Sequence, residues 1–314
     1  MQKVPVIDLR DFSDPSKRIE FVQTLGNAFR ELGFIRVKGH NVDSTITEPA
    51  YKCIREFFAL SKNTKEQYLI PGGAGQRGYT PYLSESAKGS SQPDLKEFWH
   101  VGRELPENND LYELYAPNVW PKEITDFKDN LLALYNSLEF CADVLLEALA
   151  LYLGEDSDVF TKITSQGNTI LRALYYPAMK DQKPIPGAVR AAAHEDINFI
   201  TLLIGSTSSG LQLLTREGEW LDIETNEGEI IADAGDMLSR VTNNYIPATT
   251  HRVINPDDVN TERYSIPFFV HPRPDSLLKV LDSCKGEGFP EPPRDILGID
   301  FLNQRLAEIG LHKL

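Results

Sequence analysis

The chain has 314 residues and a formal net charge of −14 at pH 7, with 41% hydrophobic and 25% charged residues. This composition is ordinary for a globular protein with a large core, and the acidic balance argues against nucleic acid or an anionic membrane surface as a partner. We expect neither a membrane span nor a secretory signal, and three unpatterned cysteines favour reduced thiols in a cytoplasmic protein.

The first third of the chain alternates strand-like and helix-like segments. Val4–Leu9 is a strand candidate, and apolar residues then recur at helical spacing as far as Gly33, a residue suited to a helix C-cap. We expect a strand at Phe34–Val37 and an amphipathic helix at about Ile46–Leu60. Residues 71–110 are rich in Gly, Ser, Pro and Gln, which predicts a long loop over a site.

A long amphipathic helix, with an apolar stripe typical of core packing, is predicted from about Lys122 to Leu153. Short β segments separated by turn residues follow, and this pattern predicts a sandwich or jelly roll. The strand candidates are Thr169–Tyr176, Val189–Asp196, Thr201–Ile204, Leu211–Leu214, Trp220–Ile223, Glu229–Asp233, Met237–Arg240, His251–Ile254 and Tyr264–Val270. The tail is Pro-rich and then helical from about Ile299 to Ile309.

His194 and Asp196 stand two residues apart in one strand candidate, so both side chains are expected on the same face. His251 offers a second imidazole from another candidate strand. Two histidines and one carboxylate that leave coordination positions open are the donor set of non-haem Fe(II) oxygenases. A lone strand histidine is more often a core or surface residue, so the metal hypothesis depends on the rest of the chain.

Arg263 and Ser265 begin the last strand candidate and also share a face. A guanidinium beside a hydroxyl matches the two oxygens of a carboxylate. The alternative is a surface arginine in a salt bridge, but the apolar run Ile266–Val270 that follows favours a buried role.

In combination these segments resemble the isopenicillin N synthase-like group of Fe(II)/2-oxoglutarate-dependent dioxygenases over nearly the whole chain. The matching motifs are V-P-V-I-D-L near the start, G-F-I-R-V-K-G-H from Gly33, R-G-Y from Arg77, L-Y-Y-P from Leu174, H-x-D from His194, T-H-R-V-I-N-P around His251, and R-x-S from Arg263 ahead of F-F-V-H-P. The resemblance implies a mainly β fold with flanking helices: a distorted jelly-roll (double-stranded β-helix) core, an N-terminal α/β region and a C-terminal helix. We expect residues 1–120 to form the N-terminal region and residues 121–314 the long helix, roll and tail, packed as one compact unit.

The resemblance also implies roles. His194, Asp196 and His251 would bind Fe(II). Arg263 and Ser265 would hold the distal carboxylate of 2-oxoglutarate, with help from Tyr176. The implied reaction uses O2 and 2-oxoglutarate, releases succinate and CO2, and hydroxylates or desaturates a small molecule. An intact Asp196 argues against a halogenase, which needs room for chloride there.

Two departures from the family pattern leave every ligand in place. Leu174 replaces the family's Asn, and the segment between His251 and Arg263 is slightly long.

The expected position of Tyr176 predicts which residues contact the substrate. If Tyr176 faces the interior of the roll, Arg172 and Leu174 share its face. Arg172 in an acidic chain suggests a small, carboxylated amino acid or natural-product intermediate, although a salt bridge at the mouth of the roll is an equal alternative. The remaining candidates, each as readily a packing residue, are Arg77, Tyr79, Phe98, His100, Asn198 and Phe269. Arg190 is interpreted as structural.

Three function classes stay open at this point. The favoured one is a 2-oxoglutarate-dependent hydroxylase or desaturase. The others are a 2-oxoglutarate-independent iron oxidase or cyclase of the same fold and a non-catalytic jelly-roll binding protein. In each case we expect a small-molecule ligand, no nucleic acid or membrane partner, and a monomer or small homo-oligomer.

Overall fold

The structure is a computed structural model that describes residues 4–308, apart from residues 74, 88–91, 184, 225 and 227. The larger sheet contains, in spatial order, β1 (Val6–Asp8), β2 (Phe34–Lys38), β10 (Ile230–Ala234), β7 (Ile200–Ile204), β12 (Arg263–Val270), β5 (Ile170–Tyr176), β4 (Glu97–Gly102) and β3 (Gly78–Thr80). The smaller sheet contains β6 (Ala191–His194), β11 (His251–Val253), β8 (Leu211–Leu214) and β9 (Trp220–Asp222), and β13 (Leu277–Leu278) pairs with β14 (Ile296–Leu297). Apart from the parallel pair of β1 and β2, the pairings in these sheets are antiparallel.

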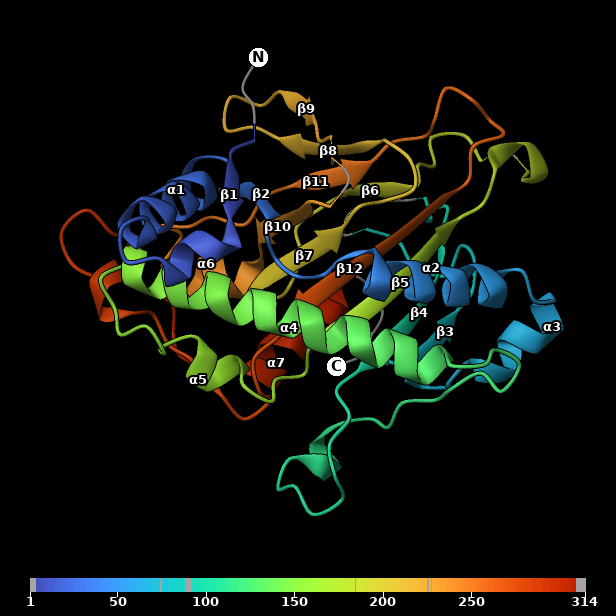
Figure 1. Cartoon of the computed structure of the whole chain (residues 1–314), viewed down its shortest axis with the longest axis horizontal. Helices are drawn as coiled ribbons and strands as arrows, with labels where there is room; N and C mark the ends of the chain where they lie inside the picture. Colours follow the sequence, from blue (N-terminus) through green and yellow to red (C-terminus); the bar gives the residue numbers. More distant parts are fainter. Residues whose placement is uncertain are drawn as a thin grey trace.

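Helices cover one face of the larger sheet (Figure 1). The helices of the described chain are α1 (Arg18–Glu31), α2 (Ser44–Phe58), α3 (Lys62–Lys65), α4 (Phe127–Tyr152), α5 (Thr161–Thr164), α6 (Asp236–Val241) and α7 (Gly298–Glu308), with 3-10 turns at Leu9–Ser13, Glu66–Tyr68, Tyr112–Leu114, Met179–Asp181 and Asp282–Cys284. The long helix α4 crosses the sheet, and α1 and α2 pack along it. Among the described residues, no helix is both long and apolar enough to span a membrane.

The strands of the larger sheet send alternate residues to two cores, because successive strand residues point to opposite faces. Ala232 of β10 and Leu202 of β7 pack in the core that contains α4. Their neighbours Ile231 and Leu203 pack against the smaller sheet, where Leu213 is fully buried. The space between the two sheets is therefore the interior of the predicted jelly roll, and the expected fold class is confirmed.

The N-terminal region contributes strands to both ends of the larger sheet. β2 lies between β1 and β10, and β3 and β4 extend the sheet beyond β5. Gly33 ends the first helix with a left-handed φ of 73°, as predicted, and a side chain there would collide with Thr249. Because these strands share one sheet with the roll, we propose that residues 1–120 and 121–314 fold as a single unit.

Three predictions of local structure are wrong. Met237–Arg240 lies in α6 and not in a strand: Met237, Leu238 and Val241 are buried at helical spacing, which a period of two cannot describe. The loop predicted at 71–110 contains β3 and β4, and each residue of β4 is buried, so no alternation marks it. β6 ends at His194, so Asp196 is not on a strand. Within the described residues, the remaining predicted elements differ from the structure only at their ends; Ile309, the predicted end of the last helix, lies outside the described residues.

Candidate active site

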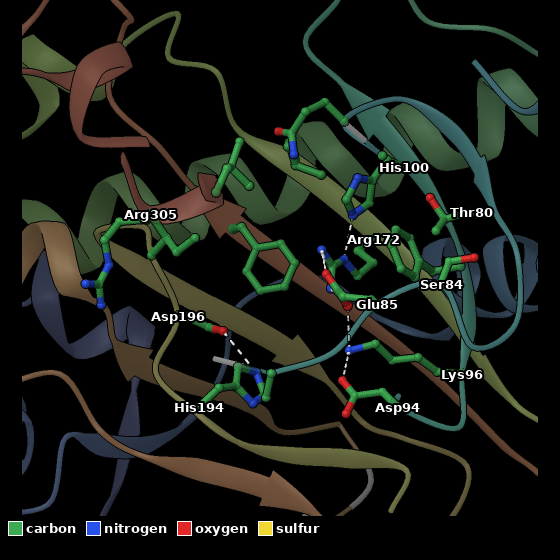
Figure 2. Close-up of a pocket in the computed structure, with 18 of the residues that line it drawn as sticks. Thr80, Ser84, Glu85, Asp94, Lys96, His100, Arg172, His194, Asp196 and Arg305 are labelled. Atoms are coloured by element: carbon green, nitrogen blue, oxygen red, sulfur yellow. Dashed lines mark hydrogen bonds and ion pairs between the residues drawn. The ribbon is translucent and has the colours of Figure 1, made fainter. Parts of the chain in front are cut away.

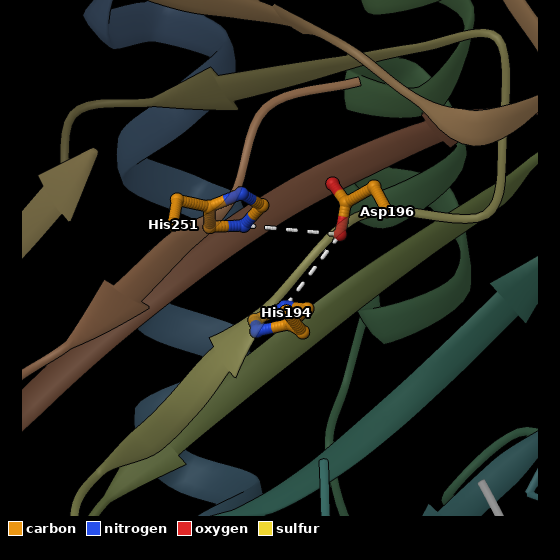
Figure 3. Close-up of side chains that lie close together, drawn as sticks. All are labelled: His194, Asp196 and His251. Atoms are coloured by element: carbon orange, nitrogen blue, oxygen red, sulfur yellow. Dashed lines mark ion pairs between the residues drawn. The ribbon is translucent and has the colours of Figure 1, made fainter. Parts of the chain in front are cut away.

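Three potential metal ligands converge inside the roll (Figure 3). His251 of β11 lies directly opposite His194 of β6 in the antiparallel register. Asp196 follows β6 in an irregular segment, and its Oδ1 lies 3.6 Å from His194 Nε2 and 3.8 Å from His251 Nε2. The ligand atoms of all three residues lie within 4.8 Å of one another. The structure thus brings the predicted triad together, although an irregular segment after the strand, and not the strand itself, positions the carboxylate.

Both imidazoles are oriented by main-chain carbonyls. His194 Nδ1 lies 2.7 Å from the Ala192 carbonyl oxygen, and His251 Nδ1 lies 3.1 Å from that of Thr249. Since a carbonyl oxygen only accepts, each Nδ1 carries the proton, and each Nε2, the ring nitrogen near Asp196 Oδ1, keeps a free lone pair. Burial and the neighbouring His251 lower the pKa of His194, which favours the neutral form that binds metals. Two imidazole nitrogens and one carboxylate oxygen fit Fe(II).

A hydrogen-bond chain holds the carboxylate of Asp196. The Thr201 hydroxyl donates to Asp196 Oδ2, and Asn198 Nδ2 donates to Thr201 Oγ1 at 2.9 Å. Oδ2 is therefore occupied, and Oδ1 faces the imidazoles. Asn198, a predicted substrate or O2 contact, borders the cavity described below, but its Nδ2 is used within this chain of hydrogen bonds.

Thr201→Val is expected to weaken metal binding by roughly 10- to 100-fold, the usual cost of losing a group that orients a ligand. The substitution keeps the shape of the side chain and removes its hydroxyl, which donates to Asp196 and accepts from Asn198. Titration of the apo-protein with Fe(II) under anaerobic conditions measures the effect. Thr164→Val is the control, because Thr164 of α5 is equally buried but its hydroxyl donates to the Phe160 carbonyl. Equal affinity of Thr201→Val and the wild type would contradict the orienting role.

The predicted carboxylate clamp lies on neighbouring strands. Arg263 of β12 is opposite Tyr176 of β5, and Ser265 is opposite Leu174. The Arg263 side chain is 1% exposed, its guanidinium lies 5.1 Å from the centre of the Tyr176 ring, and its Nε donates to the Ser208 carbonyl. Within the described chain it forms no ion pair. A buried unpaired cation is costly, so this site suits an anion such as a carboxylate.

A cavity of about 440 Å³ opens beside His194 and Asp196 (Figure 2). Its walls come from β4, β5, the end of β12 and α7, with Phe98 and Phe269 among the apolar residues. Of the predicted substrate residues, those that line it are Arg77, Tyr79, Phe98, His100, Arg172, Asn198 and Phe269. Leu174 does not line the cavity and packs instead with Phe98 and Tyr176.

Arg77 and Tyr79 line the cavity, but their polar groups bond to other groups of the protein. The Arg77 guanidinium donates to the Ala116 carbonyl at 3.1 Å and to Asn168 Oδ1 at 3.0 Å. The Tyr79 ring packs on Phe57, and its hydroxyl donates to Glu97. Both residues therefore have structural partners that explain their burial, and they are weaker substrate candidates than Arg172 or His100.

A buried charged network forms one wall of the cavity (Figure 2). The Arg172 guanidinium lies 3.3 Å from Glu85 Oε2, and its Nε donates to His100 Nε2 at 2.5 Å. Lys96 Nζ lies 2.6 Å from Glu85 Oε2 and 2.8 Å from Asp94 Oδ2. Burial alone would raise the pKa of Glu85, but Arg172 and Lys96 hold it well below its usual range. Arg172 is thus already paired, and the network contains two cations and two anions.

Sequence reasoning missed much of this wall. Glu85, Asp94 and Lys96 lie in the segment predicted as a loop, and the only signal was the alternation of charge just before an apolar run. Leu302 and Arg305 of α7 also line the cavity. Nothing in the local pattern of the tail predicts that contact, because it depends on how α7 folds back.

Comparison with known proteins gives consistent matches along the chain. Residues 4–123 match the family model described as non-haem dioxygenase in morphine synthesis N-terminal, and residues 167–272 match that of the 2OG-Fe(II) oxygenase superfamily. The chain is 30% identical over 304 residues to the 2-oxoglutarate-Fe(II) type oxidoreductase hxnY of Emericella nidulans, covering 92% of this chain and 86% of the relative.

Two solved structures are similar over almost their full lengths. A Caulobacter crescentus protein named for the 2OG-Fe(II) oxygenase family has 39% identity and a TM-score of 0.88, covering 98% of this chain and 100% of that chain. A full-length Neurospora crassa protein in complex with alpha-KG and thymine has 28% identity and a TM-score of 0.85, covering 97% of this chain and 96% of that chain.

Proposed function

We propose roles for the buried side chains of this protein. The chain belongs to the isopenicillin N synthase-like family of 2-oxoglutarate- and Fe(II)-dependent dioxygenases. His194, Asp196 and His251 hold the Fe(II). The observation that carries this assignment is their convergence within 4.8 Å beside the cavity, with both Nδ1 atoms bonded to carbonyls and both Nε2 atoms free for a metal. When bound, the iron supplies the O2 activation that couples oxidation of a substrate to decarboxylation of 2-oxoglutarate, with release of succinate and CO2.

The protein's own residues bind and shield the reactants. Arg263 and Ser265 hold the distal carboxylate of 2-oxoglutarate, with Tyr176 packed beside them; support comes from their burial and from the lack of an ion pair for Arg263 in the described chain. Phe98 and Phe269 exclude water from the substrate. We infer hydroxylation or desaturation of a small molecule in the cytoplasm, by a monomer or small homo-oligomer.

The other two function classes lose support. The enzyme uses Fe(II) and 2-oxoglutarate, as the matched family and the named relatives do, so neither a 2-oxoglutarate-independent oxidase nor a silent binding protein is favoured by any observation.

Anaerobic addition of Fe(II) and then 2-oxoglutarate to the apo-protein tests the assignment. We expect a weak metal-to-ligand charge-transfer band in the visible range only when both are present, and succinate on admission of O2. Arg263→Ala should lose the band at the same 2-oxoglutarate concentration. Iron binding without the band would point to an oxidase, and failure to bind iron would overturn the metal site.

The cavity wall limits the class of substrate. Since Glu85 already pairs with Arg172, a lone carboxylate would have to displace that partner. A group that offers both a donor and an acceptor can bind both side chains at once. A zwitterionic amino acid meets this requirement, as does a natural-product intermediate with a cyclic amide, and thymine, the ligand of the Neurospora crassa relative, is a cyclic amide.

Arg172→Gln is expected to raise the KM for the substrate by roughly 10- to 100-fold, the range for hydrogen bonds to charged groups, and to leave the KM for 2-oxoglutarate within about twofold. Succinate release with a panel of amino acids and cyclic amides identifies the substrate and then measures both constants. Arg273→Gln serves as control, because Arg273 forms an exposed pair with Asp275. An unchanged substrate KM in Arg172→Gln would remove Arg172 from the binding site.

A further inference from the structure

Arg190 is more completely buried than a purely structural role explains. It directly precedes β6, four residues before His194, and is 1% exposed. Its Nη2 donates to the Thr261 carbonyl at 2.5 Å. Nε and Nη1 are also buried but have no hydrogen-bond partner among the described residues. The hydrogen bond from Arg190 to Thr261 therefore uses only part of the five N–H donors of the guanidinium.

Arg190 lies in the same group of side chains as the clamp arginine. The Arg190 guanidinium is 5.8 Å from the centre of the Tyr176 ring, and the Arg263 guanidinium is 5.1 Å from the same point. Burial and the charge of Arg263 lower the pKa of Arg190 to about 10. Ser208, whose carbonyl accepts from Arg263, has a buried hydroxyl that is also unpartnered within the described chain.

The two guanidiniums form a buried cationic pair without an acid. In the described chain neither makes an ion pair with Asp or Glu, whereas the cations of the cavity wall, Arg172 and Lys96, are both paired. Like charges that are close and buried destabilise each other unless an anion lies between or beside them. Unused N–H donors on the same side chain give that anion its hydrogen bonds.

We propose that Arg190 is a second carboxylate-binding residue of the 2-oxoglutarate site, whose unpaired N–H groups bind the distal carboxylate together with Arg263. This inference rests on the proposed function, since it assigns the co-substrate to this group of residues. It has a consequence for selectivity: a 2-oxoacid that lacks the second carboxylate gains nothing from Arg190.

The test compares 2-oxoglutarate with 2-oxopentanoate, which has the same chain length and keto acid group but no distal carboxylate. Each is titrated anaerobically into the Mn(II)-loaded protein by calorimetry, so no turnover is needed. We expect Arg190→Gln to weaken 2-oxoglutarate binding by roughly 10- to 100-fold and to leave the affinity for 2-oxopentanoate and for Mn(II) unchanged. Arg263→Gln is the positive reference, with a loss of similar kind.

Arg252→Gln is the matched negative control, because Arg252 stacks on Trp220 and donates to Gln212 on the smaller sheet. Normal 2-oxoglutarate affinity in Arg190→Gln, with weak binding in Arg263→Gln, would overturn the inference. Arg190 would then have only the structural role of bonding to Thr261. Absence of 2-oxoglutarate binding to the wild type would instead overturn the proposed function. If Arg190→Gln does not fold, Arg190→Lys keeps the charge with fewer donors: weaker binding of 2-oxoglutarate alone supports the inference, and wild-type affinity refutes it.

Discussion

Asp196→Asn is expected to lower Fe(II) affinity by more than about 100-fold and to reduce succinate release to background. The loss exceeds the roughly 10- to 100-fold cost of removing an orienting group, because the charged ligand itself is replaced. An amide also places a donor or a neutral acceptor where Oδ1 now faces His194 and His251. Anaerobic Fe(II) titration measures the affinity, and succinate formation with saturating iron measures the activity.

Asp233→Asn is the matched control for this prediction. Asp233 is a buried carboxyl on β10, and burial, with Asp196 nearby, raises its pKa well above the usual range. An amide keeps the size and burial of this side chain, which is not one of the three converging ligands, and we expect iron affinity and activity close to those of the wild type. The metal assignment would be wrong if Asp196→Asn kept wild-type iron affinity. It would also be weakened if both Asn variants lost iron equally, since a general effect of buried acids would then be the cause.

Local sequence patterns predict the face of the sheet on which a residue lies wherever a single strand decides it. Alternation along β5 correctly places Arg172, Leu174 and Tyr176 on one face of the sheet. Alternation along the neighbouring strand β12 correctly places Arg263 and Ser265 together. A period of two is a property of each strand's own backbone, so it can be inferred before the sheet is known. The same reasoning succeeded at His194 but used the wrong element for Asp196, because β6 is only four residues long.

Long-range contacts explain what local patterns did not predict. β4 is buried on both faces, by the α4 core on one side and the cavity residues on the other, so its sequence lacks the alternation that would identify it as a strand. Glu85, Asp94 and Lys96 are polar residues in a Gly- and Ser-rich segment, and such residues usually indicate exposed loop. Only the folded chain brings Arg172 to Glu85, and that pairing separates a buried network from a solvated charge run.

The charged wall also changes the interpretation of Arg172. From the sequence, an arginine inside the roll suggested a receptor for a substrate carboxylate, with a salt bridge as the equal alternative. The structure contains the salt bridge and places it on the cavity, so the two hypotheses are compatible: the pair itself can be the recognition element. Arg172 and Lys96 together keep Glu85 ionised for that role, since both cations offset the burial of the carboxylate.

Lys96→Met is accordingly expected to destabilise the protein by about 3–5 kcal/mol at pH 7, the typical cost of removing one partner from a buried ion pair. Among the described residues, the change leaves Glu85 with Arg172 as its remaining ion-pair partner and leaves Asp94 without its lysine. Denaturant unfolding of the wild type and the variant measures the difference. Lys128→Met is the control: Lys128 pairs with Glu104 on the surface, with 48% of its side chain exposed, so its loss should cost at most about 1 kcal/mol.

The pH dependence distinguishes a coupled network from simple loss of packing. In the wild type the folded-state pKa of Glu85 is depressed, so its contribution to stability is present above the unfolded-state pKa of about 4.3 and is lost only as pH falls through the lower folded value. Without Lys96, burial is less opposed and the folded-state pKa of Glu85 rises. The destabilisation by Lys96→Met should therefore be fully present at neutral pH and shrink as the pH falls below the folded-state pKa of Glu85 in the variant, toward the lower wild-type value. A destabilisation that stays constant over this range would mean that the methylene stem of Lys96, and not its charge, stabilises the wall.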